Sequence, residues 1–207
     1  PTFTNCIIKE NYIYHFTENS YARGGGIFAY NSSSSFTNCS IIDNTSDAQV
    51  NHHEGYYAHS QGGGVHITGG SSNLTFTDCL ISSNHAYGYD HNHDDDSRAY
   101  MRGGGVYIDD GTATFDNTEI SNNRSYGDGE EKTREGSGIY NNGGSVWMDF
   151  TSIVDNHDSL GIYNNNGSIN LNQCVIANNS SQGIYRNDGT VNVVSSIIWG
   201  NSNNDAG

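Results

Sequence analysis

The sequence predicts an all-β fold, a parallel β-solenoid of about seven coils, and three observations lead to it. The composition is unsuited to helices, because the 207 residues include 26 glycines, one proline and many Asn, Ser and Thr residues. Only 15% of the residues are charged and 11% are aromatic, which separates the chain from most disordered sequences. Two short motifs also recur along the whole chain, and such recurrence is the signature of a repeat architecture.

The first motif is a glycine-rich segment followed by Ile or Val and usually by an aromatic residue. It occurs six times, reading GGGIF at 24–28, GGGVH at 62–66, GGGVY at 103–107, GSGIY at 136–140, GIY at 161–163 and GIY at 183–185. Glycine permits the positive φ angles that a chain needs where it re-enters a wall of stacked strands. We therefore expect a turn followed by an inward-facing Ile or Val in each coil.

The second motif is nine residues long and occurs seven times. Its first position is apolar, its fourth is Cys, Thr or Ser, and its sixth is Ile in every copy. The ninth position is always asparagine: Asn11, Asn44, Asn84, Asn123, Asn156, Asn179 and Asn201. Equivalent strands of a parallel solenoid lie about 4.8 Å apart, so each inward position becomes a column of one residue type. The columns predict an apolar core and an Asn ladder that hydrogen-bonds buried turn groups, each of which would otherwise cost about 1–3 kcal/mol.

The spacing of the ladder asparagines sets the size of a coil. Successive spacings are 33, 40, 39, 33, 23 and 22 residues, so the minimal coil has 22–23 residues. This period suits three short strands with three turns, and it excludes the helical TPR and ankyrin repeats. The extra residues all follow the ladder Asn, which places the insertions 12–23, 45–61, 85–102 and 124–135 at one corner. We expect one domain over residues 1–207, with the insertions stacked as a single loop face.

The four cysteines, Cys6, Cys39, Cys79 and Cys174, occupy the fourth position of the second motif. A thiol is a small hydrophobic group that fits where Thr or Ser fills the same place in other coils. We expect four free thiols, although one bridge among Cys6, Cys39 and Cys79 is geometrically allowed, because adjacent ladder positions lie within disulfide range.

Three segments carry a resemblance to a known family: FTNCSIIDN at 36–44, GSGIYNNGG at 136–144 and SIIWGN at 196–201. They resemble the coils of right-handed parallel β-helix repeat proteins of extracellular surfaces. The chain is also loosely similar to the GGA[IV] and FxxN repeats of polymorphic outer-membrane adhesins. The resemblance covers essentially the whole chain and implies a right-handed parallel β-helix that is extracellular or at the cell surface. It says little about function, because this fold carries adhesins, scaffolds and some polysaccharide-active enzymes.

An aromatic column follows from the two-residue period of a strand. If the Ile or Val of the first motif faces inward, the next residue faces out. These residues form a predicted exposed aromatic stripe: Phe28, His66, Tyr107, Tyr140, Tyr163 and Tyr185. We favour packing of the stripe against the insertions or a neighbouring chain, and recognition of sugar rings is the alternative.

The insertions also contain residues with metal-ligand chemistry. The candidate ligands are His52, His53, Glu54, His91, His93, Asp94, Asp95, Asp96, Asp128 and Glu130. Carboxylates suit Ca²⁺ and imidazoles suit transition metals, so converging insertions could hold Ca²⁺ or a transition metal. No EF-hand or HExxH spacing is present. We therefore favour a solvated acidic face, and we expect that the protein requires no cofactor.

Glycosylation sequons of the form N-x-S/T are frequent in the chain. Those at Asn44, Asn123 and Asn179 fall on the ladder and are expected to be buried. Asn31, Asn73 and Asn166 fall in turns and are the candidates for glycosylation. Chance matches in so Asn- and Ser-rich a chain are the alternative.

Charge and chain ends limit the possible partners. The net charge of −15 repels phosphate backbones and anionic lipids, and no stretch approaches the roughly 18 apolar residues of a membrane span. We therefore expect no nucleic-acid partner and no membrane insertion. Neither end contains an amphipathic cap, which predicts head-to-tail association into a fibre or a longer β-helix beyond Pro1 and Gly207.

Catalysis is not expected, since polysaccharide hydrolases need paired carboxylates and uronate lyases need an Arg or Lys base beside a Ca²⁺ site. Most of the eight basic residues fall in the insertions, and none lies on a strand face beside an acidic cluster. The predicted function is an extracellular structural or adhesive surface module. The alternative is a carbohydrate-binding or polysaccharide-active β-helix protein, with glycans as partners.

Overall fold

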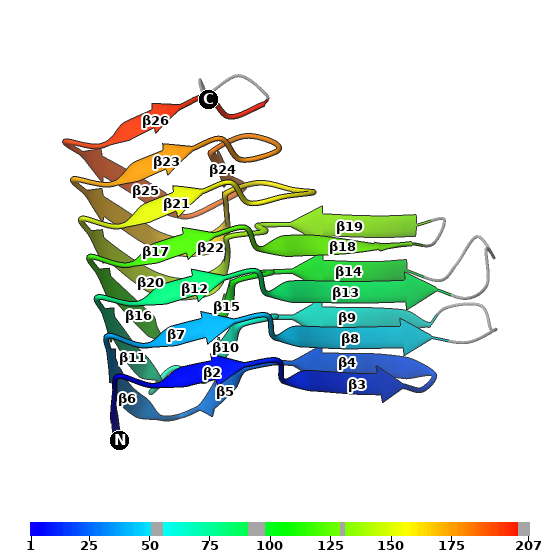
Figure 1. The fold of residues 1–207 in the computed structure, drawn as a ribbon. Helices are drawn as coiled ribbons and strands as arrows, with labels where there is room; N and C mark the ends of the chain where they lie inside the picture. The colour runs from blue at the N-terminus through cyan, green and yellow to red at the C-terminus, as the bar shows by residue number, and fades with distance from the viewer. Residues whose placement is uncertain (51–55, 91–97, 129–130, 203–207) are drawn as a thin grey trace.

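The computed structural model describes residues 1–50, 56–90, 98–128 and 131–202. Throughout this part of the chain the regular elements are β-strands, and every pair of neighbouring strands is parallel (Figure 1). The chain rises coil by coil, and each strand pairs with its equivalent in the coils below and above. Within the described residues, no helix is long and apolar enough to cross a membrane.

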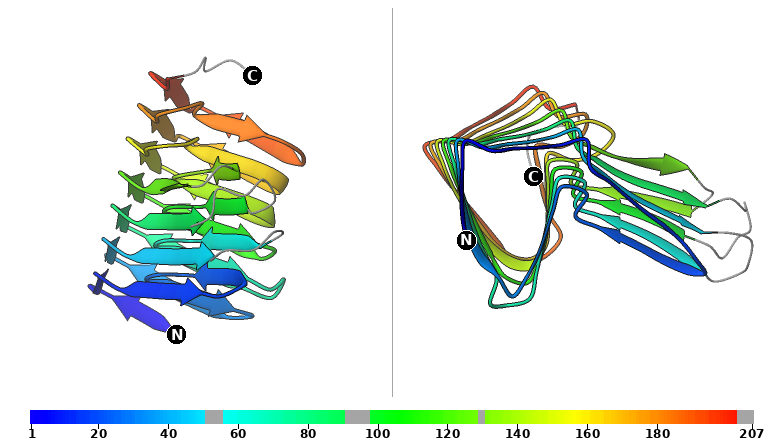
Figure 2. Two further views of the ribbon diagram at one scale, coloured as in Figure 1. Left: turned by 90° about the vertical axis from the view of Figure 1, so that its right-hand side faces the viewer. Right: turned by 60° about the horizontal axis from the view of Figure 1, so that its bottom comes forward.

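Two sheets form the walls of the solenoid, whose cross-section is visible in the right-hand view of Figure 2. The 7-stranded sheet contains β2 (Ile7–Lys9), β7 (Ser40–Ile42), β12 (Leu80–Ser82), β17 (Glu119–Ser121), β21 (Ser152–Val154), β23 (Val175–Ala177) and β26 (Ile197–Trp199). The 11-stranded sheet bends around two walls. Its first wall contains β1 (Thr2–Thr4), β6 (Ser33–Thr37), β11 (Asn73–Thr77), β16 (Thr112–Asp116) and β25 (Thr190–Val194). Its second wall contains β5 (Ile27–Tyr30), β10 (Val65–Thr68), β15 (Val106–Asp109) and β24 (Ile184–Arg186), while β20 (Ile139–Asp149) and β22 (Ile162–Asn172) belong to both.

The core consists of the predicted columns. The rings of Phe3, Phe36, Phe76 and Phe115 stack with centroids 4.8, 5.0 and 5.2 Å apart. Ile120 and its equivalents in the central coils are completely buried, and burial of one such side chain contributes about 1.5–3 kcal/mol. The four cysteines are free thiols.

The Asn ladder is present. The Nδ2 of Asn84 donates to the Oδ1 of Asn123 at 3.0 Å and to the carbonyl of Ile41 at 2.9 Å. The same Oδ1 also accepts the backbone N–H of Asn84 at 3.0 Å. This pattern repeats in the coils above and below, and the ladder side chains from the second coil upward are buried. Only Asn11, in the first coil, is exposed. The amides therefore satisfy the buried turn groups, as predicted from the sequence.

The glycine runs have two separate roles. The first glycine of each complete run has a positive φ, such as +66° at Gly24 and +65° at Gly103, as the turn argument predicts. The last glycine allows close packing against the ladder, because a Cβ on Gly105 would lie 2.9 Å from the amide nitrogen of Asn123. The sequence analysis did not foresee this second role.

The described residues of the insertions form strands, and the expectation of a loop face is wrong for them. Each insertion leaves the solenoid in one 4-stranded sheet and returns in another (Figures 1 and 2). The outgoing strands are β3 (Tyr12–Phe16), β8 (Thr45–Val50), β13 (His85–Asp90) and β18 (Arg124–Asp128). The returning strands are β4 (Asn19–Arg23), β9 (Tyr57–Gln61), β14 (Arg98–Arg102) and β19 (Glu131–Glu135). We refer to these eight strands as the arm.

The arm has a small core of its own between its two sheets. The buried side chains are Ala22, Ala48, Val50, Ala58, Ala86, Ala99 and Met101. Small residues let the sheets approach closely, and a Cβ on Gly88 would already lie 2.7 Å from the Sδ of Met101. The arm is therefore a small sandwich of two sheets, and alternate side chains of its strands face outward.

Candidate functional site on the arm and its junction

The insertions that form the arm contain most of the tyrosines and most of the basic residues of the chain. Nine of the 14 tyrosines lie in the four insertions: Tyr12, Tyr14, Tyr21, Tyr56, Tyr57, Tyr87, Tyr89, Tyr100 and Tyr126. Six of the eight basic residues lie there as well: Arg23, Arg98, Arg102, Arg124, Lys132 and Arg134. Tyr and Arg dominate the energetics of protein recognition surfaces, whereas the solenoid walls are rich in Asn, Ser, Thr and Ile. The arm is therefore the candidate functional element.

One outer face of the arm carries a ladder of stacked rings. The centroids of Tyr21 and His59 are 4.7 Å apart, and those of His59 and Tyr100 are 4.9 Å apart, with nearly parallel planes. The parallel register places these residues at the same position of β4, β9 and β14. The other outer face exposes Tyr12, Tyr14 and other rings of β3.

Arg102 joins the arm to the solenoid. Its Nε donates to the Oε2 of Glu135 at 2.7 Å, and its guanidinium lies 4.6 Å from the ring centroid of Tyr100 and 5.2 Å from that of Tyr140. Burial acts to lower the pKa of Arg102, but Tyr140 and Glu135 raise it by more, so the net shift is upward. The charged guanidinium is therefore held between an aromatic ring of the arm and one of the solenoid wall.

The predicted aromatic stripe is stacked, but it is exposed only near its ends. Tyr107 and Tyr140 lie 5.1 Å apart with an interplanar angle of 1°, and Tyr163 continues the stack at 5.1 Å from Tyr140. His66, Tyr107 and Tyr140 are buried, whereas Phe28 and Tyr185 are exposed. The prediction of an exposed stripe is wrong for the central rings, because the arm sheet with Arg102 packs over them. This agrees with the favoured expectation that the insertions cover part of the stripe.

Two histidines at this junction have depressed pKa values. Burial lowers the pKa of His59 to about 4, with a further contribution from Arg102 and Arg23. Burial also lowers the pKa of His66 to about 4, with Arg23 again contributing. Both imidazoles are therefore neutral at pH 7, and each has a buried Nδ1 without a hydrogen-bond partner among the described residues.

A cleft of about 560 Å³ lies where the arm ends. Lys132, Arg134 and Glu135 line it from the arm, and Tyr163 and Tyr185 line it from the solenoid. It exists because only 4 and 3 residues separate the ladder Asn from the next glycine in the last two complete coils, too few to build further arm strands.

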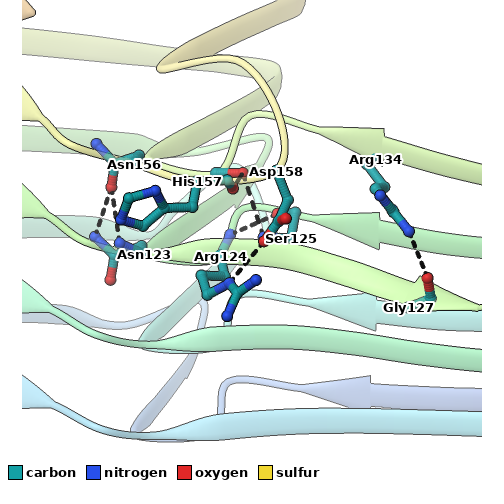
Figure 3. Close-up of polar contacts among 10 residues, drawn as sticks. Asn123, Arg124, Ser125, Gly127, Arg134, Asn156, His157 and Asp158 are labelled. Atoms are coloured by element: carbon teal, nitrogen blue, oxygen red, sulfur yellow. Dashed lines mark hydrogen bonds and ion pairs between the residues drawn. The ribbon is translucent and has the colours of Figure 1, made fainter. Parts of the chain in front are cut away.

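The charged groups around this cleft are bonded within the molecule (Figure 3). The Nε of Arg124 donates to the Oδ2 of Asp158 at 2.6 Å, and the Nη2 of Arg134 donates to the carbonyl of Gly127 at 2.6 Å. The hydrogen bond that Arg124 donates to Asp158 raises the pKa of Arg124. These contacts close the upper end of the arm and attach it to the first coil without an arm.

The glycosylation candidates Asn31, Asn73 and Asn166 are all exposed. The sequons on the ladder are at buried positions, as expected. Asn31 lies between β5 and β6, but Asn73 is in β11 and Asn166 is in β22, so the expectation that all three fall in turns is wrong for these two. Their exposed side chains leave the three positions open to modification.

Most of the candidate metal ligands lie outside the described residues: His52, His53, Glu54, His91, His93, Asp94, Asp95, Asp96 and Glu130. Asp128 is described, is exposed, and forms an ion pair with Lys132 at 3.3 Å. Among the described residues, no group of three or more His, Cys, Asp or Glu side chains is arranged to hold a metal ion.

A comparison with known families decides the classification. A family model described as the right-handed β-helix region matches residues 63–206, more than half of the chain. The chain belongs to the right-handed β-helix family. No curated protein and no solved structure matches the sequence. Family membership agrees with the parallel coils of the structure and gives their hand, and it leaves the function open.

Proposed function

We propose that this right-handed β-helix protein is a non-catalytic, extracellular structural or adhesive module that stacks end to end with further copies and displays the arm along the resulting fibre. The observation that supports this most directly is the apolar character of both ends of the solenoid. In the inward column of the 11-stranded sheet, Phe3 in the first coil is 37% exposed and Val193 in the last is 44% exposed, whereas Phe76 between them is completely buried.

These end residues belong to the same columns. Phe3 and Val193 are the two ends of one core column of the 11-stranded sheet, and Phe28 and Tyr185 are the two ends of the aromatic stack. Strands at an edge present unpaired N–H and C=O groups that another strand can pair with. A second copy placed on the axis would continue both the hydrogen bonds and the side-chain columns.

The net charge favours axial growth. At −15, copies repel one another laterally, so ordered contacts at the ends are preferred over disordered clumping. The arm occupies only the first four coils, and a fibre would therefore present arms at regular intervals separated by bare coils.

The contacts at the junction support a structural rather than a catalytic role. Arg102 and Arg124 are held in ion pairs with Glu135 and Asp158, which is typical of groups that stabilise a structure. Incubation with polygalacturonate or alginate, with and without Ca²⁺, should release no unsaturated or reducing ends above a boiled control. Robust turnover would overturn the non-catalytic assignment.

The stacking itself is tested with one variant at an end and one on the side. Val193→Asp places a charge at the exposed end of a core column, whereas Phe150→Asp makes the same kind of change at a lateral position that is 56% exposed. Negative-stain electron microscopy and light scattering should show rods for the wild type and Phe150→Asp, and monomers for Val193→Asp with an unchanged circular dichroism spectrum. A wild type that stays monomeric at every concentration contradicts the proposal.

A further inference from the structure

We infer that the outer face of the first wall binds a neutral sugar chain at Trp147. Trp147 lies in β20, points away from the core and is 50% exposed. This wall lies away from the arm in the end-on view of Figure 2. The site faces outward from the wall. Part of it lies on β25, the strand at the end of the solenoid, but the inference does not depend on the end-to-end contacts of the proposed function.

Trp147 stands in a column whose neighbouring residues are not aromatic. Its neighbours in the column are Thr114 below and Asn170 above, and no aromatic ring of the described residues stacks on it. By contrast, the stacked rings of Tyr107 and Tyr140 cover each other's faces and are buried. The C–H face of a sugar packs against the electron-rich face of a ring, so Trp147 can accept a sugar where the tyrosine columns cannot.

Polar groups beside the ring match the hydroxyls of a sugar. The Nδ2 of Asn192 donates to the Oδ1 of Asn170 at 2.8 Å, and the Nδ2 of Asn172 donates to the Oδ1 of Asp149 at 2.7 Å. These cross-coil bonds hold the side chains in place. The Oδ1 of Asn192 and the Oδ2 of Asp149 have no hydrogen-bond partner within the described residues and can accept bonds from hydroxyls.

Trp147 and these groups surround one hollow of about 280 Å³, with Val194 at its far side. A hollow that combines an aromatic ring, an apolar side chain and a few oriented polar groups is typical of small-molecule sites. Among the described residues that line it there is no Arg or Lys, and Asp149 contributes a negative charge. The ligand is therefore a neutral hexose or pentose chain, since a uronate chain would be repelled.

The two tryptophans of the chain allow a direct test. Trp199, in the last coil, is exposed as well and provides the matched control. In the Trp199→Phe variant, Trp147 is the sole tryptophan, and its emission is followed while cellohexaose, mannohexaose or xylohexaose is added. At least one of these should give a saturable change, and hexagalacturonate should give none.

Calorimetry on full-length variants completes the test. Trp147→Ala should weaken binding of the responding hexaose by about tenfold or more, Asn192→Ala should weaken it less, and Trp199→Ala should leave it unchanged. No saturable response to any neutral hexaose at millimolar concentration overturns the inference. Equal binding of hexagalacturonate, or binding that Trp147→Ala retains, overturns it as well. Circular dichroism separates loss of the site from loss of the fold, and none of these results bears on the formation of rods.

Discussion

The first four coils and the last three share one core but differ at one corner. In both parts the ladder Asn continues without interruption, from Asn84 below to Asn179 above. The first four coils send an arm strand outward after this Asn, whereas the next two turn back within a few residues. The repeat therefore combines an obligatory part, which builds the core, with an optional part, which builds the arm.

The glycines follow this division. Every complete coil keeps the glycine that faces the ladder amide, including Gly161 and Gly183, which have no arm beside them. Within the glycine runs of the first motif, a positive-φ glycine occurs only where an arm strand returns, at Gly24, Gly62, Gly103 and Gly136. Ser137 replaces the middle glycine in the fourth coil, where the coil above has no arm and the serine hydroxyl bonds to the carbonyl of His157. The glycines that remain in coils without an arm are therefore the ones that pack against the ladder amides.

The largest effect is expected from a substitution of this packing glycine. Gly105→Ala places a Cβ 2.7 Å from the carbonyl of Gly138 and 2.9 Å from the Asn123 amide, and should lower the free energy of unfolding by about 3 kcal/mol. Gly70→Ala is the control, because no atom lies within 4 Å of the added carbon. Urea denaturation measures both, and equal stability of the two variants would refute the packing role.

Loss of a ladder amide should rank next. Asn84→Ala and Asn123→Ala each remove bonds to a carbonyl and to the next ladder residue, and should cost about 2 kcal/mol. Asn179→Ala, beyond the arm, should cost a similar amount because its bonds are the same. The exposed Asn192→Ala should cost less than about 0.5 kcal/mol. Thermal shifts indistinguishable from the wild type at Asn84 and Asn123 would remove the ladder argument.

The junction offers a comparison of two ion pairs. Arg102→Ala breaks a pair that is mostly buried and packed on two rings, and should cost about 2 kcal/mol, with early loss of hydrogen-exchange protection in the arm. Arg124→Ala breaks a more exposed pair and should cost less than about 1 kcal/mol. If Arg124→Ala proved the more damaging, the arm would be attached mainly through Asp158.

The covered part of the aromatic stack should make the stability of the fold depend on pH through His66. The pKa of His66 is about 4 when folded and 6.5 unperturbed, so its contribution to stability is complete above pH 6.5 and is lost as the pH falls toward 4. His66→Tyr, which matches Tyr107 in the same column, removes this contribution. Melting temperatures measured between pH 7 and 4 should therefore fall less in the variant. Parallel curves for the two proteins would show that His66 ionises freely in the fold.

The smallest effect is expected in the column of small residues. The Sγ of Cys79 contacts the carbonyls of Phe36 and Thr77, and the hydroxyl of Thr118 bonds to the equivalent pair one coil above. Cys79→Thr should therefore change stability by less than about 1 kcal/mol. Burial raises the pKa of the Cys79 thiol, so the native protein should react slowly with a thiol reagent at pH 8. Fast reaction would show that this wall opens readily.

The sequence by itself determined the coil, its period and its inward columns. Ile120, Asn123 and their equivalents recur at fixed spacing, and parallel stacking in register turns such a recurrence directly into a column. The positive φ of the first glycine in each run was predictable for the same reason, since each coil repeats one local geometry. A second amide contact between coils was not predicted. The Nδ2 of Asn141 donates to the Oδ1 of Asn164 at 2.8 Å, but this pair links only two coils and leaves no repeated pattern in the sequence.

Only the tertiary structure decided what the insertions form and what they cover. The segment RAYMR at 98–102 alternates as a strand does, yet five residues cannot hold a strand alone, and pairing with β9 and β19 is what stabilises it. The direction of the arm then decided that Tyr107 and Tyr140 are buried while Tyr185 is exposed. Exposure of this kind depends on contacts between residues distant in the chain, and a local pattern contains no record of them.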